Sequence, residues 1–590
     1  MASDERPRKF TSFKDLARQE GGGEEPKKEG GVDPGWTLET GETPAVSAEA
    51  EQRLLDADDG PRERIDARPD GFGPMDSGPP VYAEVESEEM ELLASFRVRT
   101  VFPADVGAQA ASLPDDPLEE DFAGRVDLRG ETVFTIDGED ARDYDDAISV
   151  RALDDGALEL GVHIADVAHY VRPDTALDAE ALARATSVYL PDQVVPMLPE
   201  ILSNGLCSLV PHRPRLAYSV VMTFDAEGQR TAARVHKSVI ESVERNTYRA
   251  VQELLDGNET EDARAIARLE PELRLLATWT RRQQELRDAR GSLRMQSVER
   301  KFVFDDEHEV CGVIDAPRYF SQTLIEETAL AANQAVGDLF RERGLPTIYR
   351  VHPEKDPEEI AAVARLLAEH GLRVPNKERL TGRDVARLIR AARGRPNAEA
   401  LIGRIMGLIE RAVYEVRDHE DVATHFGLAR EAYLHFTSPI RRYPDLIVHR
   451  WLWAVEERGE EAAAELSTEE LVGDLNQIAA HCSVRSEVAE MASRAVGDLK
   501  TCQYMEPRIG ERLDGRVVRV SPPGMEILLV EQNVSAFLPT RAIGDRGTVK
   551  GATLQVRRGR AVRSFTEGHP IAVKLAEVDF LRLQLTLELV

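Results

Sequence analysis

An apolar strand that runs directly into a dense group of aspartates is the feature that most limits how this chain can fold. Residues 133–136 have the composition of a buried strand, and five aspartates follow it within ten positions: Asp137, Asp140, Asp143, Asp145 and Asp146. Carboxylates at this density repel one another, so burying them in a core requires protonation or bound cations. Oxygen ligands without cysteine or many histidines select hard cations, so the segment is a candidate Mg²⁺ or Mn²⁺ site. A solvated acidic loop is the alternative that spacing alone leaves open.

Composition excludes several classes of protein. The 590 residues are enough for several domains, and apolar runs such as residues 527–530 are far shorter than the roughly 20 residues that span a bilayer. The first residues lack the basic-then-apolar pattern of a secretory signal, and the four cysteines form neither a CxxC pair nor a disulfide framework. We therefore expect a cytoplasmic protein with no membrane segment. The net charge of −32 does not exclude a local basic groove for a polyanion.

Patterns along the chain predict a multidomain protein with a mixed α/β body and a small all-β domain after it. Apolar runs and alternation predict strands at 133–136 and 158–164. Helical spacing recurs at 176–185, 249–289, 322–341, 357–370 and 384–416. The predicted divisions are a disordered acidic segment at 1–90, a lead-in at 91–125, the α/β body at 126–450, a helical connection at 451–508 and a β-barrel at 509–590.

Two further segments carry candidate functional side chains. Arg441 and Arg442 are adjacent in a loop bounded by prolines, which suits bidentate contact with phosphate. A structural network of arginine and carboxylate is the open alternative. Glu326 and Asn333 are seven residues apart and share one face of a predicted helix, which taken alone is more often an ordinary polar face.

Taken together, these segments resemble the ribonuclease II / ribonuclease R family of processive 3′→5′ exoribonucleases, whose catalytic unit is the RNB domain. The resemblance covers about 100–590. It rests on long ordered motifs at 135–147, 161–171, 187–191, 196–209, 325–333, 425–428 and 436–450. The C-terminal strands resemble an S1 domain, an OB fold that binds RNA. The resemblance therefore implies a central mixed α/β RNB catalytic domain followed by a small S1-type barrel.

The resemblance implies catalytic roles for five residues. Asp137, Asp143, Asp145 and Asp146 stand where the family's four catalytic aspartates stand, and some of these ligate Mg²⁺, with Mn²⁺ as a possible substitute. Asp145 is the candidate for holding the attacking water. Arg441 matches the arginine that contacts the scissile phosphate and stabilises its developing charge.

The resemblance also implies a set of substrate contacts. Tyr189 matches an aromatic residue that stacks on a base near the 3′ end. Glu326 matches a glutamate near the terminal nucleotide, and Tyr248 is expected close to the same pocket, although it could equally be a core tyrosine. Met295 replaces the phenylalanine that completes the family's base clamp, so we expect a looser grip. Arg557 and Arg558 are expected to contact RNA phosphates from the barrel, with a solvated turn as the alternative.

The implied function is Mg²⁺-dependent, processive 3′→5′ hydrolysis of single-stranded RNA with a 3′ hydroxyl end, releasing 5′-nucleoside monophosphates. Little base readout is expected, because stacking and phosphate contacts carry little sequence information. The resemblance favours a monomer. The alternative is a catalytically silent RNB-type RNA-binding or scaffold protein, against which the four aspartates and Arg441 argue. A nucleotidyltransferase is disfavoured because we find no glycine-rich triphosphate cradle.

Overall fold

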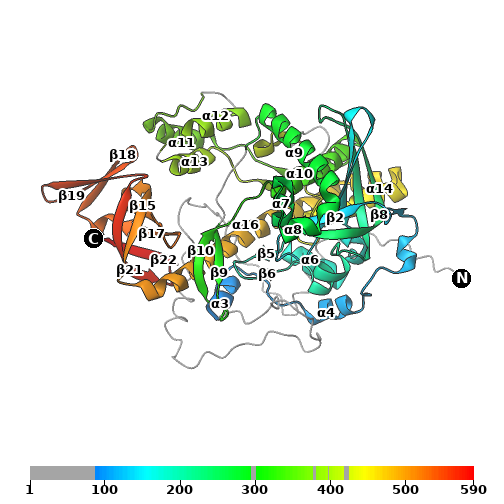
Figure 1. The fold of residues 1–590 in the computed structure, drawn as a ribbon, viewed down its shortest axis with the longest axis horizontal. Coiled ribbons are helices and arrows are strands. Elements are labelled where there is room, and N and C mark those ends of the chain that lie inside the picture. The colour runs from blue at the N-terminus through cyan, green and yellow to red at the C-terminus, as the bar shows by residue number, and fades with distance from the viewer. Residues whose placement is uncertain (1–86, 294–299, 376–379, 396, 418–423) are drawn as a thin grey trace, which may run out of the picture.

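The computed structural model describes residues 87–590, apart from 294–299, 376–379, 396 and 418–423. It consists of a large α/β body and a C-terminal β-barrel, which confirms the predicted fold class (Figure 1). Residues 1–86 of the segment predicted to be disordered lie outside the described residues. Its last four residues belong to helix α3 (Ser87–Ser95), so ordered structure begins earlier than the sequence pattern indicated. Helix α3 buries Leu93 in a small cluster that also contains Val496.

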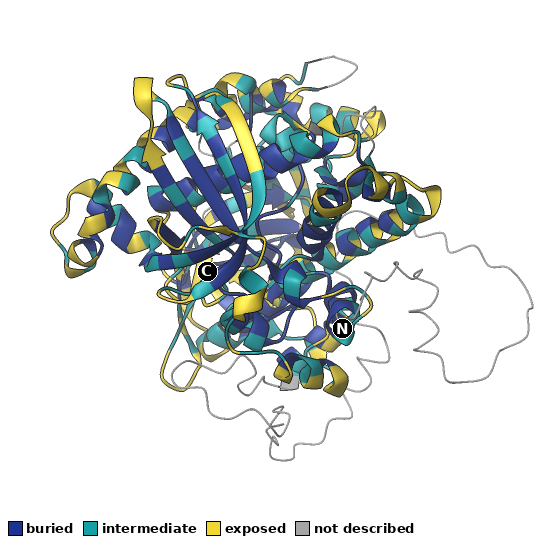
Figure 2. Ribbon diagram, turned by 90° about the vertical axis from the view of Figure 1, so that its right-hand side faces the viewer, coloured by how far each residue is buried: buried dark blue, intermediate teal, exposed yellow. Residues whose placement is uncertain are grey.

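A six-stranded sheet in the order β1-β8-β2-β3-β4-β7 forms the centre of the body. The long strand β8 also pairs with β7, so it links the two ends of the sheet. The interior of the sheet is dark blue in Figure 2, because residues such as Leu160 and Ile164 are fully buried. The strands are β1 (Val126–Asp127), β2 (Val133–Asp137), β3 (Asp146–Ala152), β4 (Leu158–Ala165), β7 (Pro214–Phe224) and β8 (Arg230–Thr247).

Helices pack around this sheet and share one hydrophobic core with it. They are α4 (Ala104–Ala111), α5 (Val167–Tyr170), α6 (Ala176–Arg184), α7 (Tyr248–Asp256), α8 (Glu261–Ala265), α9 (Glu270–Arg290), α10 (Phe320–Glu342), α14 (Tyr443–Arg458), α15 (Glu460–Leu466) and α16 (Glu469–Met505). The boundary predicted at 450 falls inside α14, whose Trp451 and Leu452 are buried in the same core. The helix therefore continues through that position.

Three helices form a subdomain of their own, inserted between two paired strands. Strands β11 (Thr347–Val351) and β12 (Val413–Arg417) pair antiparallel. Between them lie α11 (Pro357–Glu369), α12 (Gly382–Ala392) and α13 (Ala398–Met406), which share a separate core. Helical spacing was predicted through 416, and this is wrong at 413–416. Those residues form β12 because pairing with β11 overrides their local pattern.

The C-terminal domain is a closed barrel of five strands, which agrees with the predicted OB fold. They are β15 (Arg512–Ser521), β16 (Gly524–Leu529), β17 (Val534–Pro539), β21 (Pro570–Asp579) and β22 (Gln584–Leu589). A three-stranded sheet of β18 (Arg546–Lys550), β19 (Thr553–Arg558) and β20 (Ala561–Thr566) is inserted between β17 and β21. Arg557 and Arg558, predicted on the barrel, lie on this inserted sheet instead.

Short hairpins and one buried carboxylate join the parts. The hairpins are β5 (Val188–Tyr189) with β6 (Val194–Val195), β9 (Arg300–Phe304) with β10 (Val310–Asp315), and β13 (Thr424–His425) with β14 (Arg430–Glu431). Glu567, 1% exposed in the barrel, accepts hydrogen bonds from Arg404 Nη2 (3.1 Å) on α13 and from Asn397 Nδ2 (3.1 Å) just before that helix.

Within the part of the chain that the structure describes, no helix is long and apolar enough to cross a membrane.

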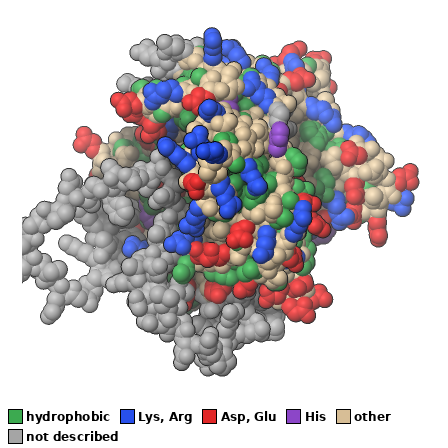
Figure 3. Space-filling model, turned by 90° about the vertical axis from the view of Figure 1, so that its left-hand side faces the viewer, with side chains coloured by type: hydrophobic (Ala, Val, Ile, Leu, Met, Phe, Trp, Pro, Cys, Tyr) green, Lys and Arg blue, Asp and Glu red, His purple; other side chains and the backbone are tan. Residues whose placement is uncertain are grey.

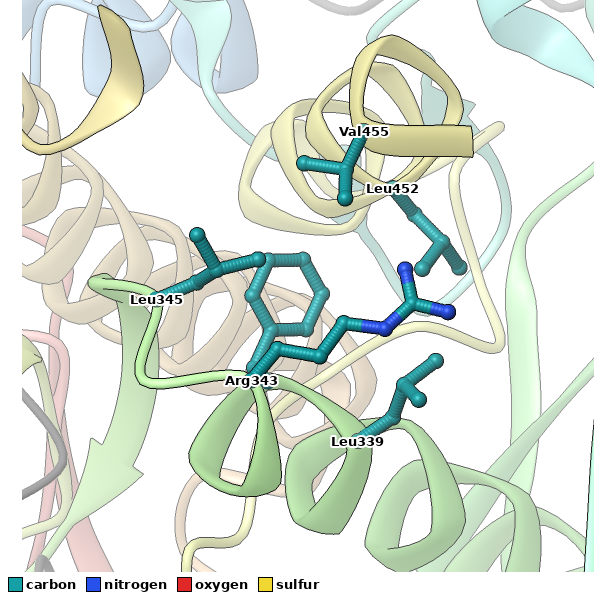
Figure 4. A pocket seen from close by; sticks show the side chains of 6 residues that line it. Leu339, Arg343, Leu345, Leu452 and Val455 are labelled. Atoms are coloured by element: carbon teal, nitrogen blue, oxygen red, sulfur yellow. The ribbon is translucent and has the colours of Figure 1, made fainter. Parts of the chain in front are cut away.

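A crease between the end of α10 and α14 is lined by Leu339, Leu345, Leu452, Val455 and the exposed Arg343 (Figure 4). The side chains leave no room for a water molecule there. We therefore treat the crease as a packing seam and assign no ligand to it.

Candidate active site

The acidic segment is a pinned loop between two neighbouring strands. Asp137 ends β2 and Asp146 begins β3. Arg245 Nη2 donates to the carbonyls of Gly138 (2.6 Å) and Glu139 (2.7 Å), which fixes the start of the loop.

Ser208 fixes the second half of the loop. Its Oγ donates to the Arg142 carbonyl (2.6 Å) and accepts from the Tyr144 N–H (3.0 Å). Asp145 is only 4% exposed. The segment as a whole is therefore built into the body, although the Asp140 side chain is 87% exposed and pairs with Lys301 at the surface.

Asp145 is held by the arginine loop, which lies almost 300 residues away in the sequence. Its Oδ1 accepts from the Ile440 N–H (2.9 Å) and its Oδ2 accepts from Arg441 Nε (3.2 Å). Arg441 Nη2 donates to Ser438 Oγ (2.9 Å), and the side chain remains 41% exposed. Among the described residues Arg441 Nη1 has no hydrogen-bond partner. One edge of the guanidinium is thus anchored and another is open, which suits contact with a phosphate oxygen.

The adjacent Arg442 has a different task. Its Nη2 donates to Asp445 Oδ1 (2.7 Å), and the same oxygen accepts from the Ser438 N–H (2.9 Å). Asp445 is fully buried at the start of α14, so this pair sets the shape of the loop that presents Arg441. Sequence reasoning singled out both arginines but missed Asp445, for which the spacing of three residues from Arg442 was the only available signal.

The four predicted aspartates share one desolvated environment. Burial raises the pKa of Asp137, Asp143, Asp145 and Asp146 above the ordinary carboxyl value. The neighbouring Asp146 carboxylate raises the pKa of Asp137 further, whereas Arg441 opposes the rise at the other three. Asp137 Oδ2 is buried and has no hydrogen-bond partner among the described residues. Such a group of carboxylates calls for protons or a cation.

The donor chemistry fits a hard divalent cation, because it consists of carboxylate oxygens and includes one unpartnered buried oxygen. The positions of the side chains fit a metal site less well than their chemistry does. Within the described ranges, no three or more His, Cys, Asp or Glu side chains are grouped so that they could hold a metal ion. Both oxygens of Asp145 are already engaged by Ile440 and Arg441, which leaves Asp137 and Asp146 as the better donors.

Tyr189 lies at the rim of this site. Its hydroxyl donates to Asp143 Oδ2 (3.3 Å), and the residue is 43% exposed. Backbone contacts fix its position, because the Tyr189 carbonyl accepts from Ser493 Oγ (2.5 Å) and the Ser187 N–H donates to the Arg441 carbonyl (3.1 Å). The structure therefore brings Tyr189, the aspartate loop and the arginine loop together.

Tyr248 lies close to the same carboxylates at the first residue of α7. Burial raises its pKa first, and the charges of Asp146 and Asp137 raise it further. Its carbonyl accepts from Ser321 Oγ (2.6 Å), so α10 holds the start of α7.

Glu326 and Asn333 of α10 contact different parts of the body. Glu326 is 44% exposed and its Oε1 accepts from Arg287 Nη1 (2.8 Å), a contact outside the aspartate group. Asn333 donates to the Tyr433 hydroxyl (3.0 Å) and accepts from the Phe436 N–H (2.8 Å), so it supports the segment that leads to the arginine loop. Met295 lies outside the described residues.

Comparison with known proteins identifies the body. The RNB domain model matches residues 125–458, which is more than half of the chain. The chain belongs to the RNB domain family. This confirms the resemblance seen in the motifs.

Curated relatives of this RNB protein carry the name ribonuclease R. Ribonuclease R 1 of Lactococcus lactis is 35% identical over 83% of this chain and 59% of its own length. Ribonuclease R of Thermotoga maritima is 36% identical over 82% of this chain and 67% of its own length. Ribonuclease R of Escherichia coli is 37% identical over 74% of this chain and 54% of its own length. The chain thus spans between about half and two thirds of the length of these relatives.

Solved structures show the same fold. Mycoplasma genitalium RNase R in complex with ribose methylated single-stranded RNA is 26% identical, with a TM-score of 0.75 over 85% of this chain and 77% of that one. Yeast Ssd1, described as a pseudonuclease, has a TM-score of 0.60 at 19% identity over 80% of this chain and 58% of that one, so it shares the fold alone. The RNB fold therefore does not by itself establish cleavage.

Proposed function

We propose that this chain is a 3′→5′ exoribonuclease that processively hydrolyses single-stranded RNA with a 3′ hydroxyl end to 5′-nucleoside monophosphates. The observation that carries the proposal is the partly buried contact between Asp145 and Arg441, in which a catalytic carboxylate and an open-edged guanidinium hold each other in place. Relatives named ribonuclease R support it, as does the RNA complex of a solved relative.

In this proposal each side chain acts by position and charge. Arg441 directs its free edge at the scissile phosphate and stabilises the charge that develops there. Asp145 orients Arg441 and is proposed to hold the attacking water. Tyr189 stacks on a base at the rim, and Tyr248 and Glu326 contact the last nucleotides, so recognition depends little on sequence.

We propose Mg²⁺ as the cofactor, with Mn²⁺ as a substitute. Asp137 and Asp146 would hold the cation, assisted by Asp143. When bound, such a cation activates water and stabilises the leaving oxygen. Binding would also neutralise carboxylates that are otherwise buried close together.

The remaining expectations also stand as proposals. Arg557 and Arg558 are exposed on the inserted sheet and would contact RNA phosphates. The protein is proposed to act as a monomer in the cytoplasm.

The test is a time course with Mg²⁺ on single-stranded RNA labelled at its 5′ end. We expect wild type to shorten it stepwise with release of mononucleotides, and Asp146→Asn to bind RNA without shortening it. Asp140→Asn is the matched control, because it makes the same chemical change in the same loop at a side chain that is 87% exposed. Equal loss of activity in both variants would contradict the assigned site.

The second candidate function is RNA binding without cleavage. The observation that favours it is that, among the described residues, no three or more His, Cys, Asp or Glu side chains are grouped so that they could hold a metal ion. Binding without shortening by wild type, with either Mg²⁺ or Mn²⁺, would establish this alternative and exclude the nuclease.

A further inference from the structure

Helix α12 presents a row of arginines that the proposed catalytic function does not use. Arg383, Arg387 and Arg390 follow one another at spacings of four and three residues, so they share one face of the helix. Arg393, the C-terminal cap residue, lies at the edge of that face. All four are exposed, whereas the opposite face buries Val385, Leu388 and Ala392 in the subdomain core.

Most of the cations in this row are not neutralised. The side chains of Arg387, Arg390 and Arg393 have no hydrogen bond or ion pair within the described part of the chain. Asp384 is the only acidic residue of α12, and it is buried with its carboxylate on Thr381. Like charges at these spacings repel, so an uncompensated row has a cost that a bound polyanion would relieve.

An open cavity lies beside the row. It has a volume of about 310 Å³. It is lined by Ala386, Ile389 and Arg390 of α12 with the cap residue Arg393, and by Asp288 of α9 with Ser292 and Leu293 just after that helix. Asp288 is the one carboxylate in the lining, against two arginines. The cavity is large enough for a nucleotide, and its charge suits a phosphate.

The row is held rigidly against the body. Arg383 Nη2 donates to the Ala289 carbonyl (2.7 Å) and Nε to the Arg290 carbonyl (3.3 Å), which caps the C-terminus of α9. Gly291 and Gly382 allow this close approach, because a Cβ on Gly382 would lie 2.6 Å from the Gly291 carbonyl oxygen. Helix α12 therefore has a fixed position relative to α9.

A chain of contacts connects this cavity with the substrate side of the site. Ser292 lines the cavity and its Oγ lies 3.5 Å from Arg287 Nε. Arg287 Nη1 in turn donates to Glu326 Oε1 (2.8 Å), and Glu326 is a proposed contact of the last nucleotides. An RNA strand with its 3′ end at the aspartates would have its upstream phosphates available to α12.

We propose that Arg387, Arg390 and Arg393 of α12 form a phosphate-binding track for the RNA strand upstream of the active site. The track contacts the backbone and not the bases, because its exposed side chains are cations without aromatic residues. This proposal rests on the proposed function only for the direction in which the RNA runs across the protein.

The experiment compares a triple variant, Arg387→Gln, Arg390→Gln and Arg393→Gln, with a control of equal charge change. The control carries Arg234→Gln, Arg264→Gln and Arg274→Gln, three exposed arginines that form only surface ion pairs. Binding of RNA of about 5 and about 30 nucleotides is measured by fluorescence anisotropy in EDTA, over a salt series. Circular dichroism and melting curves check that both variants are folded.

For the track variant we expect the Kd of the long RNA to rise about tenfold at about 0.1 M salt. The slope of log Kd against log salt should fall by about 2, which corresponds to three lost phosphate contacts at about 0.7 each. The short RNA should bind as tightly as to wild type. An unchanged long-RNA affinity, or an equal loss for both lengths, would overturn the track. Absence of cleavage by wild type would instead contradict the nuclease, and the binding data would still decide on the track.

Discussion

Two of the arginine-rich regions proposed to contact RNA, the loop at Arg441 and the inserted sheet, differ in how their charges are held. At the active site, Arg441 and Arg442 are fixed by Asp145, Ser438 and Asp445, with every distance at or below 3.2 Å. On the inserted sheet β18–β20, residues 546–566 contain six Lys or Arg and no Asp or Glu. None of those six has an ion pair within the described residues, and they contribute to the end of the molecule seen in Figure 3, where Lys and Arg side chains are prominent.

The difference separates orientation from attraction. A guanidinium held by hydrogen bonds, such as that of Arg441, acts at one place and loses its function when it moves, because it has been positioned before the substrate arrives. Exposed arginines without partners attract any polyanion and tolerate replacement one at a time. Substitutions at the site and on the sheet should therefore differ in kind as well as in size.

The largest effect is expected for Arg441→Ala. Loss of a positioned donor should lower kcat by about 10²–10³-fold, while the Kd for RNA changes little. Initial rates at saturating RNA measure this, and anisotropy measures the affinity. A similar fall in kcat for the double variant Arg557→Ala, Arg558→Ala would break the distinction between the two regions.

With Mg²⁺ present, which is proposed to keep the buried aspartates ionised, acid should destabilise the body before the barrel. Burial lowers the pKa of His163 and His425 to about 3 and that of His449 to about 4, all in the body. A histidine that is neutral when folded takes up a proton on unfolding below about pH 6.5, so its stabilising contribution is present above that pH and is lost as the pH falls.

The expected loss at pH 5 is about 2 kcal/mol for each such histidine. Hydrogen exchange by region, at pH 7 and pH 5 with correction for the intrinsic rate, measures it. Greater loss of protection in the barrel than in the central sheet would be the contrary result.

Metal-free stability should rise when a buried carboxylate is removed. Asp137→Asn eliminates repulsion with Asp146 and supplies a donor beside it, which should stabilise the protein by about 1–2 kcal/mol without Mg²⁺. Mg²⁺ should raise the Tm of wild type and raise it less in the variant. Thermal melts with and without EDTA test both points, with Asp140→Asn as the control that should match wild type.

The smallest effect is expected on the inserted sheet. Replacing Arg557 and Arg558 by Gln should weaken RNA binding only a few-fold and reduce the salt slope by about 1.4. A salt titration of Kd measures this. A loss that does not depend on salt would indicate a positioned contact like that of Arg441.

The sequence was sufficient for the elements whose signal is local. The strand that enters the aspartates and the spacing patterns behind the fold class depend on residues close together in the chain. The acidic and arginine segments lie almost 300 residues apart, and only the family resemblance linked them.

The task of Arg441 could not be predicted, because its partner Asp145 lies far away in the sequence. The partner of Arg442, Asp445, is only three residues away, and that spacing was the only signal for the pair. The role of Asn333 could not be predicted, because the sequence only places it on a helix face shared with Glu326. Residues 413–416 were predicted as helix although they lie in β12.

The three-helix subdomain leaves the body from β11 and returns on the strand beside it, where Val351 and Val413 are paired. The two ends of the subdomain therefore lie side by side, so the whole subdomain could be deleted by joining β11 to β12 directly. With a short turn in its place the hairpin could keep its register, while the capping of α9 by Arg383 and the contact of Arg404 with Glu567 would be lost together. Cutting and upstream holding of RNA could then be inherited, exchanged or engineered as separate units of the same chain.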